Sequence, residues 1–312
     1  MSADPIGPVT RHLLVRHLAS WVPDALRRSR RATFVQAYAG PDGDTAGAAL
    51  RALGRAAGGS RGRQLTVLTV VGPTDDLLAR HAALAAELPA EVTAHPVAGD
   101  LTRLPVVLKA AAAAAAPLFG YLDAVGGPPV DGDVLAAVVA GRPAELLLVL
   151  DPAARAGGEL RQRLNDAGFP LVSEVELVVD PAPGPPGRGG RLLVFATAYG
   201  KRLEAFKDAL WTVDRESGVR FRDPHDPEGR LVDPTPVPAP EPLRHELLDR
   251  LTSTGPASVT QLRQFTAERT VYRAGDANQV LEHLVASGEV NREPLAGRLS
   301  GDTMITVGAP AG

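Results

Sequence analysis

Three short segments carry the residues that could bind a ligand or act on it. The first is a glycine-containing turn, Tyr38, Ala39, Gly40, Asp42 and Gly43; the others are Asp100, after Val97-Ala-Gly, and Asp123, at the end of the run LFGYLD. A glycine turn between a strand and a helix lets backbone N–H groups approach a nucleotide-like ligand closely. A carboxylate can position a reacting group or accept its proton. These segments predict a small-molecule site.

Each segment also has a purely structural interpretation. A tight turn at 38–43 would need glycine whether or not it bound a ligand. Asp100 precedes a predicted helix, and aspartate is well suited to cap one, a role that is compatible with ligand binding. Asp123 ends a strand at the edge where α/β proteins bind ligands, which favours a functional role. His12, His17 and His81 show no metal-ligand spacing, so no metal site is predicted.

The three segments lie in an alternation of predicted strands and helices. The predicted strands are 32–38, 64–71, 91–97, 118–123 and 145–150, and the predicted helices are 12–26, 44–56, 74–88, 101–116 and 130–140. The last seven residues of helix 101–116 form the alanine run 110–116, rich in the strongest helix former. Apolar strands between helices indicate a parallel sheet covered on both faces. If a ligand binds, the 38–43 turn, Asp100 and Asp123 should converge at the carboxyl ends of these strands.

The pattern changes after a predicted helix at 159–166. Strands 171–179 and 191–197 follow one another across a Pro/Gly-rich loop, 181–190, so they should pair as an antiparallel hairpin. Five parallel strands closed by a terminal hairpin, seven strands in all, is the arrangement of class I methyltransferases, whereas dehydrogenase Rossmann domains keep a helix there. We therefore predict an α/β, Rossmann-like methyltransferase sheet within residues 1–222.

A linker and a smaller domain are predicted to follow. Residues 223–242 contain seven prolines, which favour an extended or irregular segment. Helices at 243–251, 259–266 and 277–287, with strands at 289–292 and 303–307, indicate a winged helix over 243–312. Trp211 is expected in the core between the domains.

Charge argues against DNA as the partner of this smaller domain. From Glu241 onward the chain has seven arginines and nine acidic residues, and the third helix carries Asp276 and Glu282. A recognition helix normally meets phosphates with basic residues, so sequence-specific DNA binding is not expected. Packing against the first domain or against a partner protein fits better.

Composition excludes several other classes. The 312 residues include no cysteine, so disulfides, thiol nucleophiles and cysteine-ligated metals are excluded. No apolar run is long enough to span a bilayer, and the first residues lack the apolar core of a signal peptide, so we expect a cytoplasmic protein without a membrane partner. The net charge of −3 gives no overall attraction to nucleic acid.

Taken in order, the motifs resemble those of the three-Cys-motif partner protein (TcmP) family, which looks like a group of class I methyltransferases. The likeness covers nearly the whole chain and rests on FVQAYAGPDG from Phe34, YLDAVGG from Tyr121, LLVFATAYGKRLEAFKDALW from Leu192 and TVYRAGDANQVLEHLVASGEV from Thr270. The resemblance implies S-adenosylmethionine as cofactor. It implies that the 38–43 turn and Asp100 bind this cofactor and that Asp123 positions or deprotonates the methyl acceptor.

The chain departs from the family pattern at the cofactor end of the sheet. Gln36 replaces an acid, Asp42 replaces a glycine, and Ala124-Val125 replaces a proline and an aromatic residue. The second strand ends in Val71-Gly72 instead of an acid that could hold ribose hydroxyls. Two functions remain open: a methyltransferase of unknown acceptor, and a catalytically silent scaffold that acts through a partner.

Overall fold

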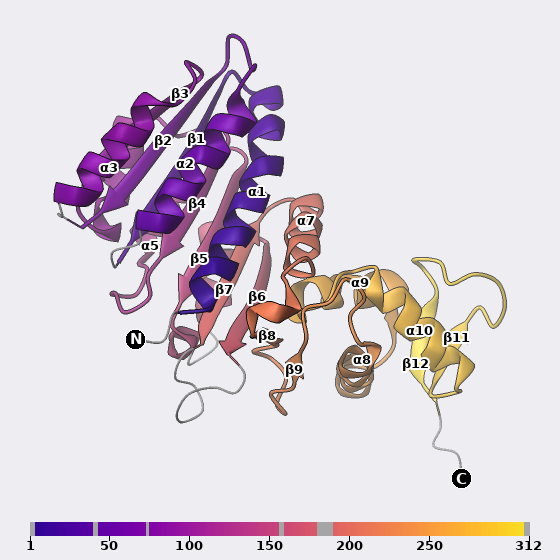
Figure 1. Ribbon diagram of the computed structural model, residues 1–312. Helices are drawn as coiled ribbons and strands as arrows, with labels where there is room; N and C mark the ends of the chain where they lie inside the picture. Colours follow the sequence, from indigo (N-terminus) through magenta and orange to yellow (C-terminus); the bar gives the residue numbers. More distant parts are fainter. Residues whose placement is uncertain (1–3, 40–42, 73–74, 156–158, 180–189, 309–312) are drawn as a thin grey trace.

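The computed structural model describes residues 4–39, 43–72, 75–155, 159–179 and 190–308, and its centre is a sheet in the order β3-β2-β1-β4-β5-β7-β6-β8-β9 (Figure 1). The parallel strands are β1 (Arg31–Tyr38), β2 (Gln64–Val71), β3 (Val92–Ala98), β4 (Leu118–Asp123) and β5 (Ala144–Leu150). The antiparallel strands are β6 (Leu171–Val179), β7 (Arg191–Thr197), β8 (Val219–Arg222) and β9 (Leu231–Val232). The prediction of an α/β fold with a mostly parallel sheet is confirmed.

The sheet has nine strands, so the prediction of seven is wrong. The predicted hairpin pairing is present, since β7 lies antiparallel between β5 and β6. The loop predicted between β6 and β7 falls outside the described residues except for Gly190. The added strands are β8, of four residues, and β9, of two. Strands this short have too few residues to show the alternating pattern of a strand, and they form because the edge of β6 offers unpaired backbone groups.

Helices cover both faces of the sheet. One face carries α1 (Ile6–Arg28), α2 (Gly43–Ala57), α3 (Asp75–Ala86) and α7 (Gly200–Leu210). The other carries α4 (Leu104–Ala110), α5 (Gly132–Val139) and α6 (Glu159–Ala167). Each face has its own cluster of buried side chains, because strands that are buried on both sides present apolar residues in both directions. Short 3-10 helices lie at Leu101–Arg103, Pro152–Arg155 and Arg215–Ser217.

The alanine run is not the helix that its composition predicts. Helix α4 ends at Ala110, and Ala112 and Ala115 have positive φ angles of 49° and 62°. The chain must reverse here so that Leu118 can pair with Thr33 of β1, and Pro117 disfavours a helical residue before it. Helix propensity is worth less than about 1 kcal/mol per residue, so the pairing of the strands overrides it.

The C-terminal part contains α8 (Pro240–Thr254), α9 (Val259–Arg269) and α10 (Asp276–Ala286). It also contains a small antiparallel sheet in the order β10 (Ala257–Ser258), β12 (Met304–Val307) and β11 (Val290–Glu293). Helix α8 begins three residues before its predicted start, because Pro240 and Pro242 fall in its first turn, where no backbone N–H is needed. Figure 1 shows these elements beside the β6–β9 end of the large sheet.

Candidate functional site

A cleft of about 460 Å³ lies at the carboxyl edge of the large sheet. It is bounded by the start of α1, the first turn of α2, the ends of β4 and β5 and the start of β7; its polar lining residues include Asp4, Arg11, Asp44, Asp123 and Arg191. Strand β1 leads to α2 on one face, whereas the neighbouring β4 leads to α5 on the other. A crevice is expected where two adjacent parallel strands send their connections to opposite faces, and ligands of α/β proteins bind there.

Asp123 lies in the wall of this cleft. Its carbonyl oxygen accepts a hydrogen bond from the N–H of Ala39 at 2.8 Å, and its Oδ1 accepts one from the N–H of Val125 at 3.2 Å. The next strand also ends in an acid: Asp151 follows β5, and its Oδ2 accepts a hydrogen bond from the N–H of Gly126 at 2.8 Å. Two strand-end carboxylates therefore shape the turn after β4. Sequence reasoning missed Asp151, although an acid directly after the apolar run of β5 was a visible signal.

The predicted 38–43 turn is only partly described. Tyr38 is 2% exposed, and its hydroxyl donates a hydrogen bond to Oε1 of Gln36 at 2.9 Å. Gln36 in turn donates to Oγ1 of Thr69 at 2.9 Å, so it links β1 to β2 inside the core. Ala39 is exposed at the edge and Gly43 begins α2, while Gly40 and Asp42 lie outside the described residues. Tyr38 is not among the residues that line the cleft, but its ring lies 5.7 Å from that of the cleft residue Tyr121.

Asp100 is exposed and caps the 3-10 helix that follows it. Its Oδ1 accepts hydrogen bonds from the hydroxyl of Thr102 at 2.5 Å and from the N–H of Thr102 at 3.0 Å. These two hydrogen bonds hold the pKa of Asp100 below its ordinary value. Asp100 follows β3, which is separated from β1 by β2, and it is not among the residues that line the cleft. The structure therefore does not bring Asp100 and Asp123 into one cavity.

Two arginines that the sequence analysis did not select line the cleft with three carboxylates. Arg11 lies 3.9 Å from Asp44, and Arg191 lies 3.8 Å from Asp4. Exposed ion pairs of this length contribute at most about 1 kcal/mol, so a charged ligand could replace either partner. Arg11 and Asp44 come from α1 and α2, and no spacing along the chain indicates that they meet. The cleft therefore offers both cations and carboxylates to a zwitterionic ligand.

The residues present fit S-adenosylmethionine in part. The volume of the cleft falls within the range of about 300–1,000 Å³ that is typical of ligand pockets. Its arginines and carboxylates match the charges of an amino-acid group. At the end of β2, however, the buried Val71 is followed by Gly72, so neither residue supplies a carboxylate for ribose hydroxyls.

Among the described residues, no group of three or more His, Cys, Asp or Glu side chains could hold a metal ion. In the same part of the chain, no helix is both long enough and apolar enough to cross a membrane.

No protein-family model and no curated protein matches this sequence. Among solved structures, the chain is similar to the METTL16 MTase domain, with 15% identity over 58% of this chain and 66% of that one and a TM-score of 0.34. It is also similar to a DUF574 family protein from Streptomyces avermitilis MA-4680, with 13% identity over 61% of this chain and 83% of that one and a TM-score of 0.34. The chain thus spans just under two thirds of the METTL16 domain. The resemblance to the TcmP family stays a prediction.

Proposed function

We propose that the protein is an S-adenosylmethionine-dependent methyltransferase of unknown acceptor. The observation that carries this proposal is the sheet order, in which five parallel strands are followed by the antiparallel pair β7 and β6. This order is the one expected of a class I methyltransferase sheet. It leaves a cleft at the switch between β1 and β4, where a cofactor would lie.

The cleft residues would hold the cofactor by charge. Arg11 or Arg191 would pair with the carboxylate of the methionine part, and Asp44 or Asp4 would accept hydrogen bonds from its ammonium group. When bound, the cofactor supplies a methyl group on a positively charged sulfur. Asp123 would orient the acceptor at the mouth of the cleft and take its proton if the acceptor needs to lose one.

We also propose that the chain is organised as an α/β domain at 1–222, a linker at 223–242 and a winged-helix domain at 243–312. Three helices with a small antiparallel sheet support this division. The exposed side chains of α10 include Gln279, Glu282 and His283 but no arginine or lysine. This surface fits contact with a protein better than contact with a DNA backbone.

A catalytically silent scaffold is the second candidate function. It is favoured by the carboxylate of Asp100, which is engaged in capping, and by the end of β2, where Val71 and Gly72 offer no acid. Losing one hydrogen bond to a charged group weakens binding by about 1.5–3 kcal/mol. That is about a tenfold to hundredfold loss of affinity.

Calorimetric titration of the full-length protein with S-adenosylmethionine and S-adenosylhomocysteine distinguishes the two functions. We expect weak but measurable binding, with Asp123→Ala raising Kd about tenfold because Asp123 lines the same cleft as Asp4 and Asp44 and its carboxylate also attracts the cofactor's ammonium group. Asp133→Ala, at an exposed acid in the first turn of α5, is the matched control and should leave Kd unchanged.

Asp42→Gly should tighten binding, because a carboxylate in the 38–43 turn would repel that of the cofactor. The scaffold function is supported if neither cofactor form binds at millimolar concentration and Asp42→Gly does not restore binding.

A further inference from the structure

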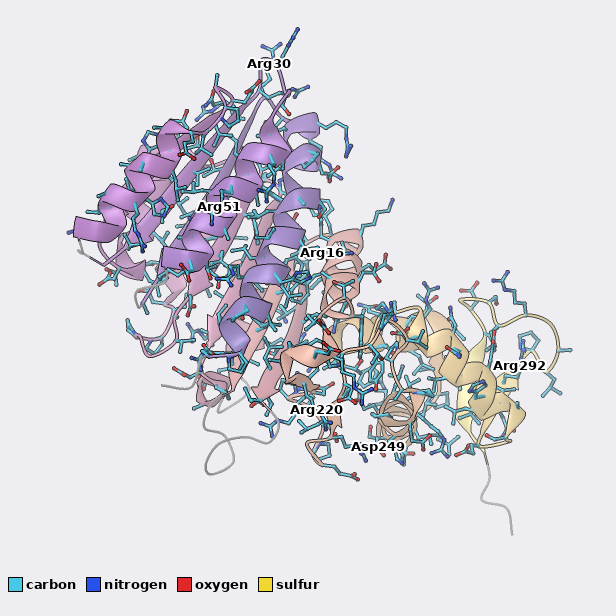
Figure 2. All side chains as sticks on the ribbon, in the orientation of Figure 1. Arg16, Arg30, Arg51, Arg220, Asp249 and Arg292 are labelled. Atoms are coloured by element: carbon cyan, nitrogen blue, oxygen red, sulfur yellow. The ribbon has the colours of Figure 1, made fainter. Side chains whose placement is uncertain are left out.

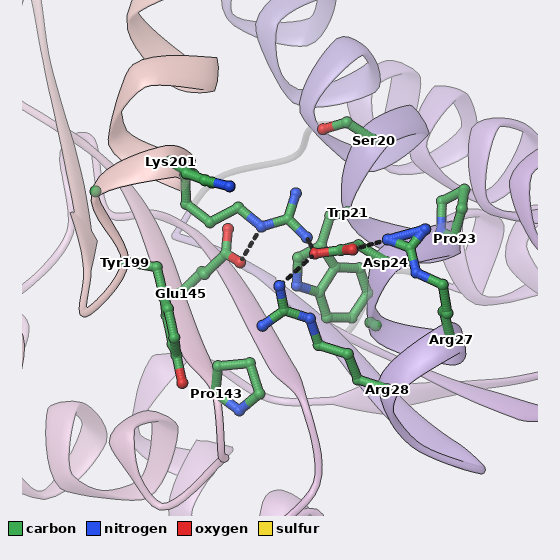
Figure 3. A pocket seen from close by; sticks show the side chains of 13 residues that line it. Ser20, Trp21, Pro23, Asp24, Arg27, Arg28, Pro143, Glu145, Tyr199 and Lys201 are labelled. Atoms are coloured by element: carbon green, nitrogen blue, oxygen red, sulfur yellow. Dashed lines mark hydrogen bonds and ion pairs between the residues drawn. The ribbon is translucent and has the colours of Figure 1, made fainter.

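A second cavity, of about 730 Å³, lies at the opposite edge of the sheet (Figure 3). It is enclosed by the last turns of α1, the amino end of β5 and the start of α7, and it is lined by Trp21, Asp24, Arg28, Glu145, Tyr199 and Lys201 among others. Glu145 is the second residue of β5, whereas Val149, near the end of the same strand, lines the proposed cofactor cleft. The two cavities are therefore separate, and an inference about this one does not rest on the proposed function.

Positive charge exceeds negative charge in the lining of this cavity. Its cations are Arg27, Arg28, Lys201 and Arg202, and its carboxylates are Asp24 and Glu145. All three arginines contact Asp24; Arg28 does so at 3.2 Å. Glu145 is 1% exposed and is shared between Nε of Arg202 at 3.1 Å and Nε2 of His17 at 2.8 Å. Both carboxylates are thus already paired with basic side chains, and the lining carries more positive than negative charge.

The surplus cations are accessible to a ligand. Lys201 is exposed, and its ammonium group forms no ion pair with another described residue; Figure 3 shows it beside the cavity. The side chain of Arg28 is 51% exposed at the rim, with its guanidinium 5.7 Å from the centre of the Tyr199 ring. The positive end of α7 adds to this charge, because no side chain caps that helix at Tyr199.

We propose that this cavity binds the phosphate group of a small phosphorylated molecule. A phosphate dianion would balance the surplus charge, and guanidinium and ammonium groups are the side chains that bind phosphate oxygens best. The exposed ring of Tyr199 and the half-buried Pro143 provide an apolar wall beside the cations for the organic part of the ligand. The buried Glu145 pairs with the half-buried Arg202, which also contacts Asp24 of α1.

Titration of the full-length protein with adenosine monophosphate, inorganic phosphate and adenosine, at constant ionic strength, tests this proposal. We expect saturable binding of both phosphates, with Kd for uncharged adenosine at least about tenfold higher. Tighter binding of the nucleotide than of inorganic phosphate supports an organic phosphate as the ligand. Equal affinities for the nucleotide and inorganic phosphate would overturn the proposal that the ligand has an organic part, and would identify free phosphate as the ligand. Absence of saturable binding by either phosphate overturns the proposal.

Variants of residues that line the cavity test whether the phosphates bind there. Lys201→Ala and Arg28→Ala should each raise Kd for the phosphates about tenfold, because each removes one accessible cation. Arg16→Ala, at an exposed arginine of the same helix α1 that does not line the cavity, should leave Kd unchanged (Figure 2). Equal Kd in all three variants would overturn the proposal. Binding of S-adenosylmethionine should be unaffected throughout, so failure of this proposal is distinct from failure of the proposed function.

Discussion

Lys207, Asp223 and Glu246 bring three titratable side chains into the interior where α7, the end of β8 and α8 meet. Burial raises the pKa of Glu246 to about 9 and that of Asp223 to about 6, and it lowers the pKa of Lys207 to about 7. Lys207 is fully buried, and its ammonium group donates a hydrogen bond to the carbonyl of Thr270. The charged forms of these groups are therefore disfavoured in the folded protein.

Glu246→Gln should make stability less dependent on pH. Between pH 4.5 and 9 the folded protein holds a proton on Glu246 that the unfolded chain has lost, so the free energy of unfolding falls as pH rises. Lys207 opposes this trend only between about pH 7 and 10.5, so the effect is clearest from pH 5 to 7. Urea denaturation measures the free energy of unfolding at each pH. We expect this free energy to fall from pH 5 to 7 by about 2.5 kcal/mol less in the variant than in the original protein.

Glu241→Gln provides the comparison for this prediction. Glu241 lies on the same helix, but its side chain is 65% exposed, so this variant should keep the slope of the original protein. An unchanged slope in Glu246→Gln would show that Glu246 ionises normally in the folded state.

At the scale of elements, one buried carboxylate joins α1, β5 and α7. Glu145 of β5 accepts hydrogen bonds from His17 of α1 and Arg202 of α7, and the His17 ring packs 4.7 Å from Phe119 and 5.0 Å from Phe195. His17, Glu145 and Arg202 lie far apart in the sequence. The position of α1 across the sheet therefore depends on a polar contact inside an aromatic cluster.

Glu145→Ala should lower the free energy of unfolding by about 3 kcal/mol, because it leaves the buried His17 without its carboxylate partner and leaves the half-buried Arg202 with Asp24 alone. Glu145→Gln should lower it less, since an amide oxygen still accepts one hydrogen bond. Urea denaturation measures both. Glu204→Ala, at an exposed acid of α7, should change the value by less than about 0.5 kcal/mol. A similarly small effect of Glu145→Ala would contradict a role for this contact in docking α1.

For the whole molecule, the question is how the C-terminal part is attached to the sheet. Arg161 of α6 donates to the carbonyl of Glu268 at 2.9 Å, and Lys207 of α7 donates to that of Thr270, so two buried basic side chains hold the C-terminal end of α9. Positive groups at that end of a helix are favoured by its dipole. Trp211 is 1% exposed and contacts Phe221 at 5.7 Å and Tyr272 at 5.5 Å, which confirms the prediction that it lies in the core between the two parts.

Arg161→Ala should loosen the C-terminal part from the sheet. The variant loses hydrogen bonds to Val172 of β6 and to Glu268 of α9, so residues 223–312 should unfold at a lower temperature than the sheet. Calorimetry should then resolve two transitions, and limited proteolysis should cut within 223–242 earlier. Arg80→Ala, at an exposed arginine of α3, should keep the original profile. A single unshifted transition in Arg161→Ala would mean that apolar contacts alone hold the two parts together.

The sequence by itself determined the type of fold and the order of its main elements. Apolar runs such as 146–150, placed between predicted helices, indicate strands buried on both faces, and the short distance between 171–179 and 191–197 indicates an antiparallel pair. The place of Asp123 at a strand end was also predictable, because parallel strands end at one edge. These features follow from local periodicity and chain connectivity.

Only the tertiary structure decided how the polar residues are used. It placed Asp100 in a cap and the Tyr38 side chain in the core, and it brought Arg11 and Arg191 to the cleft beside Asp123. It also turned the alanine run 110–116 away from a helix. The physical reason is that hydrogen bonds and ion pairs between segments distant in the chain leave no periodic signal, and pairing within the sheet outweighs a propensity of less than about 1 kcal/mol per residue.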